Sequence, residues 1–155
     1  MIDLKKILVP TDFSEYSQRA LCFACSLAEK FHAELHLLHV LQDFVALVPE
    51  PGMAFPPPGD YLEEMRQNAQ RSLEKLPPDD WNIQVSISRS VRQGPPFLEI
   101  VRLAKDENFD LIVIGTHGRS GLAHVLLGSV TEKVVRKASC PVLTVKDENH
   151  HFEMP

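Results

Sequence analysis

Two short runs of branched apolar residues constrain the fold of this chain more than any other feature. The run 6–9 (KILV) stops at Pro10, and the run 111–114 (LIVI) leads directly into Gly115. Strands that are apolar at nearly every position are buried on both faces, which is typical of a parallel sheet covered by helices. Longer segments with helical spacing of apolar residues separate such runs. The sequence therefore predicts an α/β domain.

The expected order of elements is β-α-β-α-β-α-β-α-β. The strands are expected over 6–9, 34–40, 82–88, 111–114 and 141–145. The helices are expected after an N-cap at Ser14 and over 60–76, 96–108 and 129–138. The first helix should bury Ala20, Phe23, Leu27 and Phe31, which recur at spacings of three and four. Because crossovers between parallel strands are right-handed, the fold class is a doubly wound sheet with helices on both faces.

Length and charge bound the remaining possibilities. The 155 residues suit one domain, expected over 1–146, with a polar tail over 147–155. A net charge of −5 argues against a nucleic-acid polymer as partner, which would need a basic stripe. No apolar run reaches the roughly 18–20 residues of a membrane span. The N-terminus lacks the apolar core of a signal peptide, so a cytoplasmic protein without membrane insertion is expected.

The three cysteines do not predict a disulfide framework, since their number is odd. Cys22 and Cys25 have the spacing of a redox or zinc motif, but they lie inside an apolar helical run. No second cysteine or histidine pair completes a zinc site. Both residues are therefore interpreted as small buried hydrophobic side chains.

Four of the seven glycines fall within fourteen residues of one another, directly after an apolar strand. They are Gly115, Gly118, Gly121 and Gly128. Glycine lets backbone N–H groups approach an anion closely, and a helix N-terminus adds unpaired donors. Hydroxyls of Ser129 and Thr131 and the guanidinium of Arg119 could add further donors. The alternative is a tight turn followed by an ordinary helix, and neither GxxxxGK[ST] nor GxGxxG is present.

A second polar segment, Pro10-Thr11-Asp12, follows the first apolar strand. Doubly wound sheets bind ligands outside the carboxyl ends of strands, where the strand order reverses. If the first and fourth strands are neighbours, this segment and 115–118 face the same crevice. Asp12 is then the candidate carboxylate of the site. Its alternative role is to compensate the dipole of the following helix.

Taken together, these motifs resemble the universal stress protein family. The resemblance rests on VPTD at 9–12, on Gly115-x2-Gly118-x9-Gly128-Ser129, and on LLGSV at 126–130 and CPVLTV at 140–145. It extends from about Lys5 to Val145 and implies a five-stranded parallel sheet of order 3-2-1-4-5. It also implies a homodimer through the last strand, Val142 to Val145. The complete glycine pattern is that of the ATP-binding subgroup of the family.

The resemblance further implies a set of contacts to an adenine nucleotide. Asp12, with Pro10 and Thr11, would line the nucleoside, and the backbone of Val40 would meet the adenine edge. The ribose would be flanked by Gly115, Thr116 and His117. The phosphates, often with Mg2+ or Mn2+, would be held by Gly118, Gly128, Ser129, Val130 and Thr131. Whether ATP, ADP or AMP is the native ligand stays open.

Three functions are consistent with these residues. The first is a regulatory protein of the stress response that binds ATP. The second is a slow Mg-dependent ATPase or phosphotransferase in the same pocket, and the third is a dimeric interaction module with a vestigial pocket. A general acid or base needs a positioned partner, and none is indicated for His117. The first function is therefore favoured, and no catalytic residue is predicted.

Overall fold

The computed structural model describes residues 2–42, 59–117 and 127–146. The segment 47–60, which holds five of the twelve prolines and is expected from them to be a loop, lies almost wholly outside the described residues. The predicted tail over 147–155 lies outside them too. Within the described part of the chain, no helix is long and apolar enough to cross a membrane.

The sheet has five parallel strands in the order β3-β2-β1-β4-β5. This confirms the predicted fold class and strand order. The strands are β1 (Lys6–Pro10), β2 (Glu34–Leu41), β3 (Ile87–Gln93), β4 (Leu111–Gly115) and β5 (Val142–Val145). β1 lies at the centre. After β3 the chain crosses to the other side of β1, so the strand order reverses between β1 and β4.

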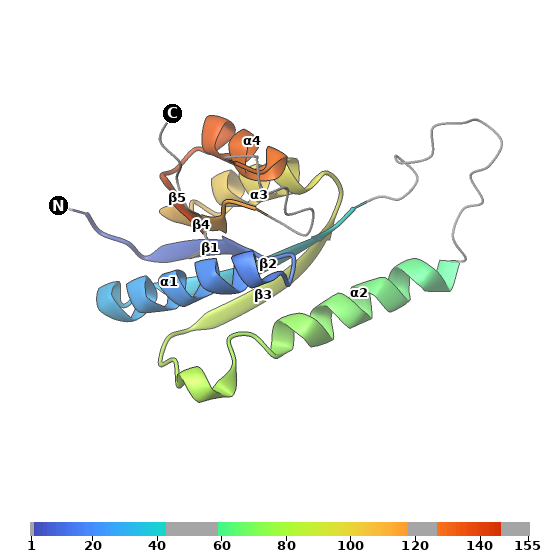
Figure 1. Ribbon diagram of the computed structural model, residues 1–155, viewed down its shortest axis with the longest axis horizontal. Coiled ribbons are helices and arrows are strands. Elements are labelled where there is room, and N and C mark those ends of the chain that lie inside the picture. Colours follow the sequence, from blue (N-terminus) through green and yellow to red (C-terminus); the bar gives the residue numbers. More distant parts are fainter. Residues whose placement is uncertain (1, 43–58, 118–126, 147–155) are drawn as a thin grey trace, which may run out of the picture.

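Helices cover both faces of the sheet (Figure 1). They are α1 (Glu15–Phe31), α2 (Gly59–Glu74), α3 (Pro96–Asp106) and α4 (Ser129–Lys137), with a short 3-10 helix, η2 (Asp79–Trp81), after α2. One core cluster joins β1 to α1 and α2 through residues such as Val9, Leu21 and Leu73. The other joins the opposite face to α3 and α4 through Leu8, Leu103 and Val134. The apolar runs of β1 and β4 contribute alternately to both clusters, which is why nearly every position in them is apolar.

The third strand lies further along the chain than predicted. β3 spans Ile87–Gln93, whereas the alternation of Ile83, Val85 and Ile87 predicts a strand over 82–88. Ile83 and Val85 pack against the first core cluster, although they precede the strand. β3 is an edge strand made mostly of serines, arginines and a glutamine, so Ile87 and Val91 are its only apolar residues.

The buried face of α1 also differs from the prediction. Phe23 is 48% exposed and Phe31 37%, while the residues that meet the sheet are mostly small. These buried residues are Ser17, Ala20, Leu21, Ala24, Cys25 and Ala28. Small side chains let α1 lie close to the strands. Cys25 is buried as predicted, and burial raises the pKa of its thiol to about 12; Cys22 is exposed, so the prediction is wrong for that residue.

Candidate functional site

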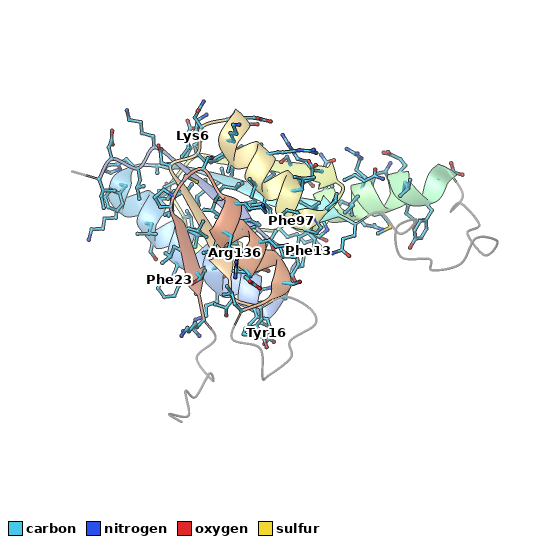
Figure 2. All side chains as sticks on the ribbon, turned by 90° about the horizontal axis from the view of Figure 1, so that it is seen from above. Lys6, Phe13, Tyr16, Phe23, Phe97 and Arg136 are labelled. Atoms are coloured by element: carbon cyan, nitrogen blue, oxygen red, sulfur yellow. The ribbon has the colours of Figure 1, made fainter. Side chains whose placement is uncertain are left out.

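The two polar segments singled out in the sequence meet at one edge of the sheet. Ile7 pairs with Leu111 and Leu8 with Ile112, so β1 and β4 are neighbours that end at the same edge. The start of α1 lies beside these strand ends, as the ring centroids of Tyr16, in its first turn, and His117 are 5.6 Å apart. In Figure 2, Tyr16 lies at the end of the molecule toward which the arrow of β5 points. This edge is the switch point at which such sheets bind ligands.

Asp12 shapes the loop between β1 and α1. Its Oδ1 accepts hydrogen bonds from the backbone N–H of Ser14 at 3.0 Å and from the Ser14 hydroxyl at 2.5 Å. Ser14 in turn is the N-cap of α1, with its side chain accepting from the N–H of Ser17. Asp12 therefore supports the start of α1, which was the alternative role considered for it. Its contact with a nucleoside stays a prediction.

The main chain of Val40 extends beyond the end of β1. Val40 belongs to β2, and the last hydrogen bond between β1 and β2 runs from the N–H of Thr11 to the carbonyl of Leu38, at 2.8 Å. The next bond of a regular parallel ladder would join the N–H of Val40 to the carbonyl of Thr11. No such bond occurs among the hydrogen bonds of the described residues, and the Thr11 carbonyl instead accepts from His39 Nδ1 at 2.8 Å. The N–H of Val40 therefore takes no part in the β1–β2 ladder.

Thr116 and His117 form the β4 side of the crevice. Thr116 is 2% exposed, and its N–H donates to the carbonyl of Val145 at 3.0 Å. Its hydroxyl lies 3.0 Å from His117 Nδ1. His117 is half-buried against Tyr16. The structure thus holds the His117 ring in place from two sides.

Gly115 is required by packing against α1. A Cβ at this position would lie 2.9 Å from the carbonyl oxygen of Tyr16, closer than real Cβ atoms approach, and a tight 3.1 Å from its carbonyl carbon. The sequence interpretation connected Gly115 with the ribose of a ligand. The structure gives it a separate reason to be glycine, which is the close approach of α1 to β4.

Gly128 likewise contacts the backbone of the protein. Its N–H donates to the carbonyl of Thr116 at 2.6 Å, and an added Cβ would lie 3.1 Å from the same oxygen. This donor joins the start of α4 to the end of β4, and a contact of Gly128 with phosphate stays a prediction.

Thr131 has a similar internal partner. Its hydroxyl donates to the carbonyl of Gly115 at 2.8 Å, and the residue is 4% exposed. The hydroxyl proton predicted to reach a phosphate is used inside the protein. Ser129 is exposed and Val130 half-buried. The backbone N–H groups of 129–131 lie in the first turn of α4, where helices offer no internal acceptor.

Two predicted site residues, Gly118 and Arg119, lie outside the described residues, so their contacts stay predictions. Among the residues that are described, no group of three or more His, Cys, Asp or Glu side chains could hold a metal ion. A hollow of about 440 Å³ lies elsewhere, between α2 and β3, and is separated from β1 by β2.

His36 and His39 face opposite sides of β2, as their spacing predicts. His36 lies between the hydroxyls of Ser88, at 2.8 Å, and Ser90, at 2.7 Å. Burial lowers the pKa of His36, and the charges of Arg92 and Lys6 act in the same direction while that of Glu107 opposes them. Their spacing bears only on whether both histidines could bind one metal ion, and it gives no hint of the bond from His39 to the Thr11 carbonyl. A polar residue near the carboxyl end of an otherwise apolar strand was the available signal.

The lowered pKa of His36 predicts a loss of stability in acid. The unfolded chain takes up a proton near the ordinary histidine pKa of about 6.5, whereas the folded chain resists protonation to lower pH. The free energy of unfolding should therefore fall as the pH drops below about 6.5. In urea denaturation between pH 7.5 and 5, His36→Gln should show a shallower decline than the wild type. Parallel declines would contradict this assignment.

The sheet and its switch point define the class to which this protein belongs. This is a doubly wound parallel α/β domain whose switch point is lined by main-chain donors and by the start of a helix. A family model described as the universal stress protein family matches residues 3–146. The chain belongs to this family.

Relatives and solved structures agree with that assignment. Universal stress protein MJ0531 of Methanocaldococcus jannaschii is 39% identical over 92% of this chain and 82% of its own length. The solved structure of MJ0577, from the same organism, is 34% identical with a TM-score of 0.81, covering 96% of this chain and 99% of its own. A universal stress protein solved in complex with cAMP is 26% identical with a TM-score of 0.62, covering 94% of this chain and 98% of its own.

Proposed function

We propose that this protein binds an adenine nucleotide, with ATP as the expected ligand, in the crevice between β1 and β4, and acts as a regulatory protein of the stress response. The observation that carries the proposal is the main chain of Val40, which continues past the last bond between β1 and β2. The family member solved with cAMP supports the choice of an adenine nucleotide.

The exposed main chain of Val40 suits adenine. Its C=O would face the N–H of residue 13 in a longer ladder, but the Phe13 N–H donates to the Thr11 hydroxyl at 3.0 Å. A carbonyl accepts from the exocyclic amino group of adenine, whereas guanine presents an acceptor, O6, at the corresponding position. An N–H beside that carbonyl can donate to a ring nitrogen of adenine. The pair therefore favours adenine over guanine.

The rest of the proposed site follows from the two strand ends and α4. Pro10, Thr11 and Asp12 would border the nucleoside, with Gly115, Thr116 and His117 across the ribose. The N–H groups at the start of α4 and the Ser129 hydroxyl would meet the phosphates, since helix N-termini favour anions. Gly118 and Arg119 complete the proposed phosphate site. A divalent cation would enter with the phosphates rather than through its own set of protein ligands.

Binding without rapid turnover is the proposed activity. Hydrolysis requires a group that activates water, and the nearby side chains have structural partners. Asp12 Oδ1 is engaged by Ser14, and His117 Nδ1 lies next to the Thr116 hydroxyl. Slow ATP hydrolysis remains the second candidate, which the same experiment distinguishes.

Calorimetric titration of the nucleotide-free protein tests the proposal. ATP should bind at one site per chain, and GTP at least about tenfold more weakly, since a mismatched acceptor pair costs more than about 1.4 kcal/mol. Phosphate release with Mg2+ is measured in parallel. Saturable ATP binding without release supports a sensor, and turnover supports the enzyme. The absence of binding to any adenine nucleotide would contradict both.

We further propose a homodimer through the edge strand β5. Among the described elements, β5 pairs with β4 alone. Leu143 of β5 is 37% exposed, with Val135 of α4 at 46% and Phe23 of α1 at 48%. Figure 2 shows Phe23 on the same side of the molecule as β5. Exposed apolar side chains beside an open strand edge are typical of an association surface.

The dimer proposal predicts that Leu143→Glu yields a monomer. A charge placed on each side of a two-fold interface repels its copy and loses apolar burial. Light scattering after size exclusion measures the mass. Leu62→Glu is a matched control, because Leu62 is also 37% exposed but lies on α2, away from β5. A monomeric wild type, or a Leu143→Glu variant that remains dimeric, would refute the assignment.

A further inference from the structure

His39 occupies the position at which β1 and β2 separate. It is 9% exposed near the carboxyl end of β2, and its Nδ1 lies 2.8 Å from the carbonyl oxygen of Thr11. A carbonyl oxygen only accepts hydrogen bonds, so Nδ1 must carry the hydrogen. The imidazole therefore donates a hydrogen bond to the Thr11 carbonyl, just beyond the end of β1.

This bond replaces a backbone bond of the sheet. Even-numbered residues of β2 pair with β1: the Glu34 N–H donates to Lys5, and the Leu38 carbonyl accepts from Thr11. Continuing that pattern, the Thr11 carbonyl would accept from the N–H of Val40. With His39 bound to this oxygen, the ladder of the described residues ends one step earlier.

His39 also contacts the loop on the other side of Thr11. Its ring lies 4.5 Å from the ring of Phe13, at an interplanar angle of 31°. Phe13 has a φ of 65°, which bulky L residues rarely adopt. In this conformation the Phe13 N–H donates to the Thr11 hydroxyl, away from the carbonyl of Val40. The stacked imidazole thus supports the Phe13 conformation that keeps the carbonyl of Val40 out of the ladder.

We propose that His39 is a positioning residue for the nucleobase. His39 binds the Thr11 carbonyl and supports the conformation of Phe13, so the β1–β2 ladder ends at Leu38. The N–H and C=O of Val40 are then left to face the crevice. His39 selects adenine through Val40 and not by its own contact. This role rests on the proposed nucleotide site, although the effect on the ladder exists without any ligand.

The ligand-free protein provides the first test. Nitrogen-15 spectra should show His39 with a protonated Nδ1, and the Val40 amide should exchange rapidly with deuterium. His39→Phe keeps a ring against Phe13 but removes the donor, so the Val40 N–H should pair with Thr11 and exchange at least about tenfold more slowly. An unprotonated Nδ1, or a Val40 amide that is already protected in the wild type, would overturn the proposal.

Nucleotide selectivity provides the second test. His39→Phe should lower the ratio of ATP to GTP affinity by about tenfold, the loss expected for one hydrogen bond to the base. His39→Asn, which keeps an N–H donor near the position of Nδ1, should restore most of the ratio. His36→Phe is the control, because His36 is on the same strand and equally exposed, at 9%, but faces the other side. An unchanged ratio in a folded His39→Phe would overturn the proposal.

The two tests separate this inference from the function on which it rests. If the wild type binds no nucleotide, the proposed function fails, while the exchange of Val40 still decides the role of His39 in the ladder. If the wild type selects ATP and His39→Phe does so equally, the positioning role fails and the proposed function stands.

Discussion

Gly115→Val is expected to lower the free energy of unfolding by about 3 kcal/mol, at the upper end of typical overpacking costs. The β-carbon alone would lie 2.9 Å from the carbonyl oxygen of Tyr16, and the methyl groups would extend further into α1. Neither β4 nor α1 can move easily, because both pack against the same core cluster. Urea denaturation followed by circular dichroism measures the change.

Gly128→Ala is the comparison for this variant. Its β-carbon would lie 3.1 Å from the carbonyl oxygen of Thr116, so a small shift relieves the contact and a smaller loss is expected. The free energy of unfolding of Gly115→Ala should lie between those of the wild type and Gly115→Val. A Gly115→Val protein within about 0.5 kcal/mol of the wild type would show that the approach of α1 to β4 is not tight.

Ser129→Pro is expected to weaken ATP binding by about 10- to 100-fold without destabilising the fold. Proline at the first position of a helix removes an N–H that has no partner within the helix. The preceding Gly128 has φ −61° and ψ 148°, a conformation that a following proline accepts. The variant then loses the two proposed phosphate donors of residue 129, its N–H and its hydroxyl, and each hydrogen bond to a charged group contributes about 1.5–3 kcal/mol. Calorimetry measures the affinity and thermal unfolding the stability.

Ser129→Ala separates the two donors of this residue. It keeps the backbone N–H and removes the hydroxyl, so it should weaken binding less than the proline variant. Full ATP affinity in Ser129→Pro, with the fold intact, would remove the start of α4 from the phosphate site.

Sequence patterns sufficed for the central elements and failed at the periphery. The runs at 6–9 and 111–114 are apolar throughout because both faces of β1 and β4 are covered, so pattern and structure coincide. β3 is an edge strand with Ser88 and Arg89 exposed, and most of the apolar alternation that predicts a strand lies in the segment before it. In α1, periodicity favoured the large Phe23 and Phe31, but close packing selected alanines instead.

The candidate site shows the same division. The sequence located both polar segments at one edge, because carboxyl ends of neighbouring parallel strands meet there. It could not show which donors are used inside the protein. The hydrogen bonds from Gly128 to Thr116 and from Thr131 to Gly115 depend on tertiary contacts. His39 was missed for the same reason, as its partner Thr11 lies 28 positions away in the chain.

Nitrogen-15 chemical shifts recorded while ATP is added test the central claim most directly. If the nucleotide binds in the crevice between β1 and β4, the amides of Thr11, Val40, Thr116 and Val130 shift together along one saturation curve, while those beside the hollow between α2 and β3 stay unchanged. Shifts confined to α2 and β3, or no saturable shift at any amide, would contradict the proposed site.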